Sequence, residues 1–158
     1  MGSSTQSCRR PGRTTGSSIA GVDSRGIHHV GIAVPDLDRA VETYARIFGA
    51  TLEHREAVPD QGVEAASVLV GGSRIELLAP TGEDTPVGRF LARRGPGVHH
   101  LAYEVADIEL VLNSLAADGV ELIDTVPRVG LFGLQVAFIH PDAVDGVLTE
   151  VVSVARAS

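Results

Sequence analysis

Lysine and tryptophan are absent from this 158-residue chain, and cysteine occurs once, at Cys8. A single cysteine excludes both an internal disulfide and a thiolate metal cluster. All thirteen basic residues are arginines, so any anion site must use arginine or backbone amides. No apolar run approaches the roughly 20 residues that span a bilayer. We therefore expect a protein without a membrane partner.

Positive charge is scarce and unevenly placed. The net charge is −7, and residues 1–26 carry four arginines against Asp23, which leaves an acidic body in residues 27–158. Nucleic-acid affinity rests on clustered cations, so we expect no nucleic-acid partner. Residues 1–26 offer almost no apolar surface, and no hydrophobic segment follows their arginine pair. We interpret them as a disordered leader or expression remnant, and we expect a cytoplasmic protein.

What the chain does contain is a repeat. IHHVGIAVPDL begins at Ile27 and VHHLAYEVADI begins at Val98. Each phrase opens a series of one strand, one helix and three further extended runs. In the first series these segments are IHHVGIAV, DLDRAVETYARIFG, ATLEHREAV, VEAASVLV and SRIELLA. In the second they are VHHLAYEV, ADIELVLNSLAADG, VELIDTV, LQVAFIH and GVLTEVVS.

The repeat predicts the fold class. Two βαβββ modules, 27–80 and 97–154, are joined by a linker over 81–96 that holds a short helix, TPVGRFLARRG. A module of this length is too short to bury its own sheet face, so the two copies must pack on each other. We therefore predict one α+β domain over 27–158.

The doubled histidines point to a site. Side chains alternate along a strand, so the two histidines of each pair should face opposite sides. His28 and His99 share a strand face with bulky apolar residues, and this face should pack beneath a helix. His29 and His100 fall on a face kept small by glycine and alanine, which leaves room for a ligand.

A carboxylate inside an apolar strand completes each module, Glu76 in RIELLA and Glu150 in LTEVVS. An unpaired buried carboxylate is costly unless a cation or hydrogen bonds satisfy it. A lone strand histidine is usually structural and a lone strand glutamate usually faces solvent. Here both recur at equivalent places, so His29, Glu76, His100 and Glu150 are predicted to form an N2O2 set for a divalent metal. His28 and His99 are interpreted as hydrogen-bonded core residues.

With those residues identified, the chain resembles the vicinal-oxygen-chelate superfamily, and within it the methylmalonyl-CoA epimerases. The phrases that carry the resemblance are HHVGIAVPDLDRAVETY, IELLAPTGEDTPVGRFLARRGPGVHHLAYEV and PRVGLFGLQVAFIHPDAVDGVLTEVV. The resemblance implies a cupped mixed β-sheet around the metal, with the helices outside. Carried over by position, the family's ligands fall on the same four residues.

The resemblance also implies the activity, an isomerase that interconverts the 2R and 2S forms of methylmalonyl-CoA or a close 2-alkylmalonyl-CoA. A proton is removed between a thioester and a carboxylate and returned on the other face. The catalytic residues so implied are Glu150, as ligand and base, and Glu64, which serves only if a bulge or shifted register turns it inward. The implied metal is Co2+, with Mn2+, Ni2+, Mg2+ or Zn2+ as alternatives. The implied partners are an acyl-CoA substrate and a second copy in a homodimer.

Several positions depart from the family. Some bacterial relatives place the second carboxylate where this chain has Ala65. The Gly-rich loop has Leu131 and Phe132 in place of a small residue or histidine, and Asp142 replaces a lysine. Arginines that could compensate for that lysine are Arg89, Arg93, Arg94 and Arg128.

Two other functions stay open at this point. One is another metalloenzyme of the superfamily, such as a glyoxalase-type isomerase or lyase or an enzyme of specialised metabolism. The other is a binding or resistance protein without turnover. The four-ligand set disfavours the second, because such binders can dispense with a metal.

Overall fold

The computed structural model describes residues 22–154. The leader predicted over 1–26 lies mostly outside that range. Its boundary needs correction, because strand β1 begins at Ser24 and not at Ile27. Arg25 in this added stretch contacts Glu104 of the paired strand β5, with 3.4 Å between the guanidinium and the carboxylate.

The described chain contains the two predicted βαβββ modules. The elements of the first are β1 (Ser24–Ala33), α1 (Leu37–Phe48), β2 (Thr51–Val58), η1 (Pro59–Gln61), β3 (Val63–Val70) and β4 (Ser73–Pro80). Helix α2 (Pro86–Arg94) forms the linker. The elements of the second are β5 (Gly97–Val105), α3 (Ile108–Ala117), β6 (Arg128–Val129), η2 (Leu131–Gly133), β7 (Gln135–Ile139), η3 (Pro141–Val144) and β8 (Thr149–Ser153).

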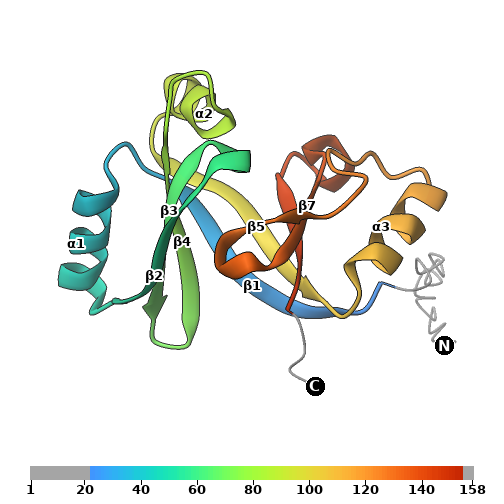
Figure 1. Ribbon diagram of the computed structural model, residues 1–158, viewed down its shortest axis with the longest axis horizontal. Coiled ribbons are helices and arrows are strands. Elements are labelled where there is room, and N and C mark those ends of the chain that lie inside the picture. The colour runs from blue at the N-terminus through green and yellow to red at the C-terminus, as the bar shows by residue number, and fades with distance from the viewer. Residues whose placement is uncertain (1–21, 155–158) are drawn as a thin grey trace, which may run out of the picture.

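All the strands join one curled, mixed sheet. Its order is β2-β3-β4-β1-β5-β8-β7-β6. The modules meet where β1 and β5 pair antiparallel, and inside each module the first strand pairs in parallel with the last. Figure 1 shows α1 and α3 on opposite flanks of the molecule, with the long β1 and β5 between them. The predicted fold class, an α+β domain with a cupped sheet and outer helices, is confirmed.

Helix ends follow from local sequence. The side chain of Asp36 accepts a hydrogen bond from the backbone of α1, and Asp107 does the same for α3. Such caps satisfy amides that have no partner inside the helix. Helix α1 ends at Gly49, whose φ of 64° is the left-handed conformation that glycine adopts most easily.

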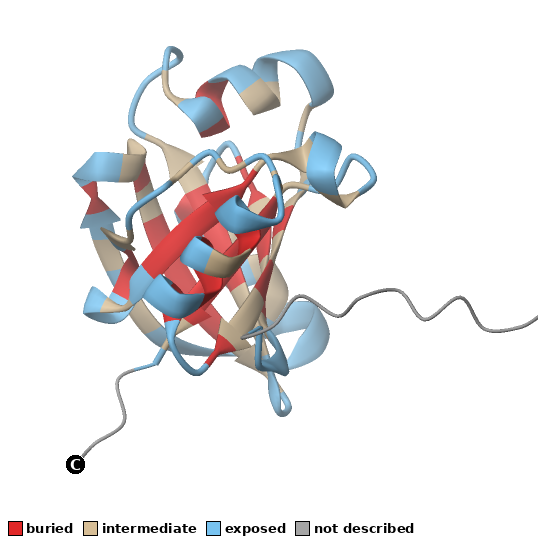
Figure 2. Ribbon diagram, turned by 90° about the vertical axis from the view of Figure 1, so that its right-hand side faces the viewer, coloured by how far each residue is buried: buried red, intermediate tan, exposed pale blue. Residues whose placement is uncertain are grey.

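The core is divided between the two modules. One cluster packs α1 against β3 and β4 through residues such as Leu37, Val68 and Leu77, and another packs α3 against β7 and β8. Figure 2 shows buried residues along the strands and exposed ones on the outer sides of the helices. Each helix therefore covers its own module, and the inner face of the sheet is left for the site.

One predicted strand is wrong. The run VELIDTV (120–126) was expected to be extended, but only Leu122 forms an isolated bridge, to Ile139. The Asp124 side chain instead accepts hydrogen bonds from Phe138 and from Arg128, 2.9 Å and 3.1 Å long. The segment therefore forms no regular ladder, and the described strand between α3 and β7 is the two-residue β6, which lies after the predicted run.

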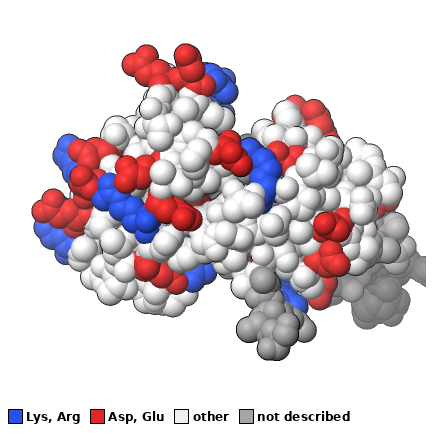
Figure 3. Space-filling model, viewed as in Figure 1, with Lys and Arg blue, Asp and Glu red and all other residues white. Residues whose placement is uncertain are grey.

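In residues 22–154, no helix is both long and apolar enough to cross a membrane. Acidic and basic groups are interspersed over the face of the described residues in Figure 3. That face carries no continuous stripe of the positive charge that nucleic-acid binding needs.

Candidate metal centre

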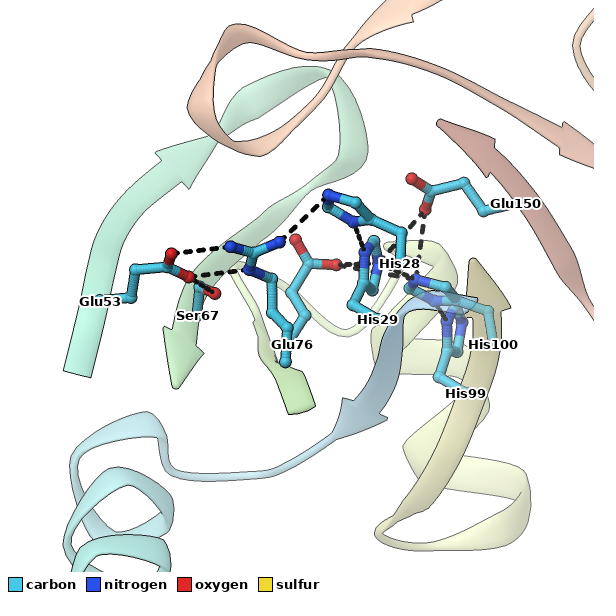
Figure 4. Close-up of polar contacts among 9 residues, drawn as sticks. His28, His29, Glu53, Ser67, Glu76, His99, His100 and Glu150 are labelled. Carbon is cyan, nitrogen blue, oxygen red and sulfur yellow. Dashed lines mark hydrogen bonds and ion pairs between the residues drawn. The ribbon is translucent and has the colours of Figure 1, made fainter. Parts of the chain in front are cut away.

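Four buried side chains converge from four strands, as predicted. His29 comes from β1, Glu76 from β4, His100 from β5 and Glu150 from β8. The Nε2 atoms of the two histidines lie 3.1 Å apart. His29 Nε2 is 3.1 Å from Glu76 Oε2, and His100 Nε2 is 3.2 Å from Glu150 Oε2. Figure 4 shows the four groups pointing toward one another.

The two central strands make room for these groups with small residues. Gly31 of β1 lies in register with Glu76 on one side and His100 on the other. Ala102 of β5 lies in register with His29 and Glu150 in the same way. A Cβ atom at Gly31 would come within 2.2 Å of the His100 ring. The small face inferred from the sequence is therefore the floor of the centre.

Burial shapes the protonation of the cluster. It raises the pKa of the Glu150 carboxyl to about 8, and it lowers the pKa of the His100 imidazole. Burial is the largest single influence on Glu76 and would raise its pKa, but the hydrogen bond with His29 and the charge interactions with the nearby imidazoles together outweigh it, so the net shift is downward. Without a cation, the protein therefore favours the charged form of Glu76 and the neutral form of Glu150, and a bound cation would favour ionisation of both.

The donor set fits a divalent cation. In residues 22–154, no arginine forms a salt bridge with Glu76 or Glu150. All four donor atoms lie within 4.8 Å of one another. Metal–ligand bonds of about 2.1 Å place neighbouring donors about 3.0 Å apart at octahedral angles and about 3.4 Å apart at tetrahedral ones. The two shorter separations, 3.1 and 3.2 Å, fall in this range, and the other two, 3.6 and 3.9 Å, are somewhat longer.

The prediction that His28 and His99 face away from the site is wrong. The pairing of β1 with β5 shifts register between Ile27 and His29, and again between Gly31 and Ile32, opposite His99. A bulge of this kind interrupts the alternation of side chains. His28 Nδ1 therefore lies 2.9 Å from His29 Nδ1, and His99 Nδ1 lies 3.0 Å from His100 Nδ1.

A cavity of about 140 Å³ opens beside His100. Apolar side chains from both modules form most of its wall, with a few polar groups at the side. The lining residues are Asp60, Gln61, Leu78, Pro86, Val87, His99, His100, Ile123, Arg128, Phe138 and Leu148. An apolar chamber with a few polar groups is typical of a small-molecule site.

Glu64 lies outside the centre. It pairs with Ala79 of β4, whereas the neighbouring Ser67 pairs with Glu76, so regular alternation places Glu64 on the opposite sheet face. Its carboxylate accepts a hydrogen bond of 2.8 Å from Arg55, which also binds Asp38 in the first turn of α1. The Glu64 side chain therefore does not point toward the centre, as a catalytic role would require.

Two more groups at the site, Arg74 and Glu53, were not predicted from the sequence. Arg74 contacts His28, and its guanidinium also binds Glu53 through two hydrogen bonds. Because Arg74 precedes Glu76 by two positions in one strand, the period of two could have placed it on the inner face. Glu53 had no comparable signal, since its strand shows no regular alternation.

The residues of the Gly-rich loop cover the centre from the other side. Phe132 has a φ of 61°, an uncommon value for a side chain of this size. Its backbone N–H donates to Glu56 over 2.8 Å, and its ring stacks on His54 at 4.6 Å. Module two is thereby attached to β2 of module one.

Comparison with known proteins agrees with this geometry. Residues 28–138 match the model of the glyoxalase/bleomycin resistance protein/dioxygenase superfamily. The mitochondrial methylmalonyl-CoA epimerase of Dictyostelium discoideum is 34% identical, over 88% of this chain and 84% of its own.

Solved structures are similar as well. The methylmalonyl-CoA epimerase of Mycobacterium tuberculosis superposes with a TM-score of 0.81 and 38% identity, covering 91% of this chain and 95% of its own. A variant of the Streptomyces coelicolor methylmalonyl-CoA epimerase, in complex with 2-nitronate-propionyl-CoA, gives 0.82 and 38%, covering 86% and 99%. The chain therefore belongs to the glyoxalase/bleomycin resistance protein/dioxygenase superfamily, as a methylmalonyl-CoA epimerase-like member.

Proposed function

We propose that this protein is a metal-dependent epimerase that interconverts the 2R and 2S forms of methylmalonyl-CoA or a close 2-alkylmalonyl-CoA. The observation that carries the proposal is the buried His2Glu2 cluster beside an apolar cavity. The similarity to enzymes of that name over most of the chain supports the same substrate class.

His29, Glu76, His100 and Glu150 would hold the cation. A bound divalent ion supplies Lewis-acid stabilisation of the negative charge that develops on the substrate oxygens when the proton leaves. Three protein features prepare for this role. The donors converge without an arginine among them, the floor is small, and most of the wall of the nearby cavity is apolar, which strengthens electrostatic stabilisation there.

Glu150 is the proposed base. Its Oε2 faces the imidazoles of His100 and His29, at 3.2 Å and 3.9 Å. Within residues 22–154 no hydrogen-bond donor reaches its other oxygen, which leaves that oxygen to accept a proton in the proposed reaction. With Glu64 on the opposite sheet face, Glu150 is the one carboxylate of the proposed pair that lies at the centre.

For the CoA portion, Arg128 is the candidate that the geometry favours. It lines the cavity, whereas Arg89, Arg93 and Arg94 are exposed along α2. Asp142 is exposed in η3 and offers no positive charge to a phosphate.

Finer assignments rest on the family resemblance. We infer Co2+ as the metal, a homodimer as the assembly and the cytoplasm as the location. Metal analysis of the purified protein and its mass in solution would check the first two directly.

The proposed activity is tested with metal-loaded protein and either the 2R or the 2S form of methylmalonyl-CoA in deuterated water. One deuteron should enter at the 2-position, which mass spectrometry detects, and the two forms should interconvert. Absence of both exchange and interconversion, with the metal content verified, would overturn the epimerase assignment. Metal-stripped protein is the control, and activity should return when the ion is added back.

A further inference from the structure

We propose that Arg74, anchored by Glu53, weakens metal binding at the His29 side of the centre by determining which nitrogen of His28 carries the proton. This inference rests on the metal site proposed above. In it Arg74 is a positioning residue, because it acts on His29 only through His28.

The contacts form a continuous chain toward His29. Ser67 Oγ donates to Glu53 Oε2 over 2.8 Å, and Arg74 donates to both oxygens of Glu53, at 2.8 Å and 2.7 Å. Nη1 of the same guanidinium lies 3.2 Å from His28 Nε2. His28 Nδ1 then lies 2.9 Å from His29 Nδ1. Figure 4 marks this contact with a dashed line. The bidentate pair with Glu53 fixes the direction in which Arg74 presents its N–H groups.

The direction of these hydrogen bonds follows from the donor inventory. A guanidinium donates and never accepts, so His28 Nε2 must be the acceptor. A neutral His28 therefore carries its proton on Nδ1 and donates to His29 Nδ1. His29 must then carry its own proton on Nε2, the nitrogen that lies 3.1 Å from Glu76 Oε2.

Ligation requires the opposite arrangement. A metal takes the lone pair of His29 Nε2, so the proton of this imidazole must sit on Nδ1. His29 then donates to His28 Nδ1, and the proton of His28 moves to Nε2 through exchange with solvent. Both rings stay neutral with one proton each, but the N–H of His28 now points at an N–H of Arg74. The hydrogen bond between Arg74 and His28 must therefore open when the ion binds.

The second module lacks this restraint. His99 Nε2 has no hydrogen-bond partner within residues 22–154, and His99 lines the cavity with the Phe90 ring at its edge, 5.0 Å between centroids. His99 can carry its proton on Nε2 and accept from His100 Nδ1 without losing a contact. The two ligand histidines thus lie at equivalent positions, but metal binding breaks an outer hydrogen bond only on the His29 side.

Zinc affinity, measured by competition with a chelator, tests the proposal. Arg74→Met removes the donor and keeps an apolar chain, and Arg128→Met is the matched control, since it also removes one positive charge beside the centre. We expect the dissociation constant for Zn2+ to fall for Arg74→Met by about tenfold more than for Arg128→Met, the scale of outer contacts to a ligating histidine. Equal changes in the two variants would mean that charge alone acts, and the proposal would fail.

A spectroscopic measurement follows the proton itself. Long-range 1H–15N spectra of protein labelled in its histidines identify the protonated nitrogen of each ring. We expect His28 to be protonated on Nδ1 without metal and on Nε2 with Zn2+, while His99 is protonated on Nε2 in both states. An unchanged His28 in zinc-loaded protein would overturn the inference alone. A parent protein that binds no zinc would reject the metal centre and this inference together.

Discussion

The two modules place equivalent residues at the centre and surround them differently. Each contributes one histidine, one glutamate and one small residue to the floor, at matching positions in the sheet. Outside that set they diverge, because module one attaches Arg74 and Glu53 to its bulged histidine, while module two leaves His99 at the cavity. The two modules thus share the four converging side chains and differ in the contacts that surround them.

The largest difference between the modules is expected when their equivalent carboxylates are replaced. Glu150→Gln keeps an oxygen ligand and removes the base, so proton exchange at the 2-position should fall by about a hundredfold to ten-thousandfold while metal is retained. Glu76→Gln alters a ligand only and should reduce exchange less. Deuterium incorporation and metal content are measured for both variants. If Glu150→Gln retains its metal and exchanges as fast as the parent, the base lies elsewhere.

The floor residues provide a second contrast. Gly31→Ala would place a Cβ atom 2.2 Å from the His100 ring, whereas the equivalent Ala102 already carries one. Displacement of His100 should weaken metal binding by about ten- to a hundredfold, in line with other disturbances of a ligating histidine. Gly97→Ala is the matched control, since a Cβ atom there would meet nothing within 4 Å. Titration with a metal indicator distinguishes the two, and equal affinities would show that the strand adjusts.

The Arg74 anchor of module one should also contribute to stability in a pH-dependent way. The hydrogen bond from Arg74 lowers the pKa of Glu53 to about 2, so its stabilising effect is present above about pH 4.5 and is lost as the pH falls toward 2. Glu53→Gln should lower the free energy of unfolding by about 1 kcal/mol at pH 7 and by less at pH 3.

Urea unfolding at the two pH values measures this difference. Glu42→Gln, which changes an exposed glutamate of α1, is the control and should differ little from the parent at either pH. The same loss for Glu53→Gln at both pH values would rule out an ionised Glu53 as its source.

The smallest effect is expected at Glu64. Its carboxylate is 45% exposed and binds Arg55 on the outer sheet face. Because exposed ion pairs contribute little, Glu64→Gln should leave both the exchange rate and the melting temperature close to those of the parent. A large loss of exchange in this variant would require Glu64 to turn into the cup when substrate binds.

The convergence of His29, Glu76, His100 and Glu150 could be predicted from the sequence because the repeat supplied two independent copies of one pattern. Alternation alone placed His29 and His100 on the small face, and it also placed Glu64 on the opposite face from its neighbour Ala65. The bulges at His28 and His99 could not be predicted, since a bulge is defined by the partner strand and not by the residue that it displaces. The irregular path of VELIDTV could not be predicted for a similar reason. Asp124 finds its partners, Phe138 and Arg128, only after the chain has folded back.

The placement of the four donors has a mechanical consequence. They lie on β1, β4, β5 and β8, so the strands they join span most of the described chain, from its first strand to its last. An ion bound to all four would stabilise the folded state selectively, because the four donors come together only when the strands have paired. Removing the ion would then release both halves of the sheet at once, and resistance to unfolding would rise with the concentration of free metal.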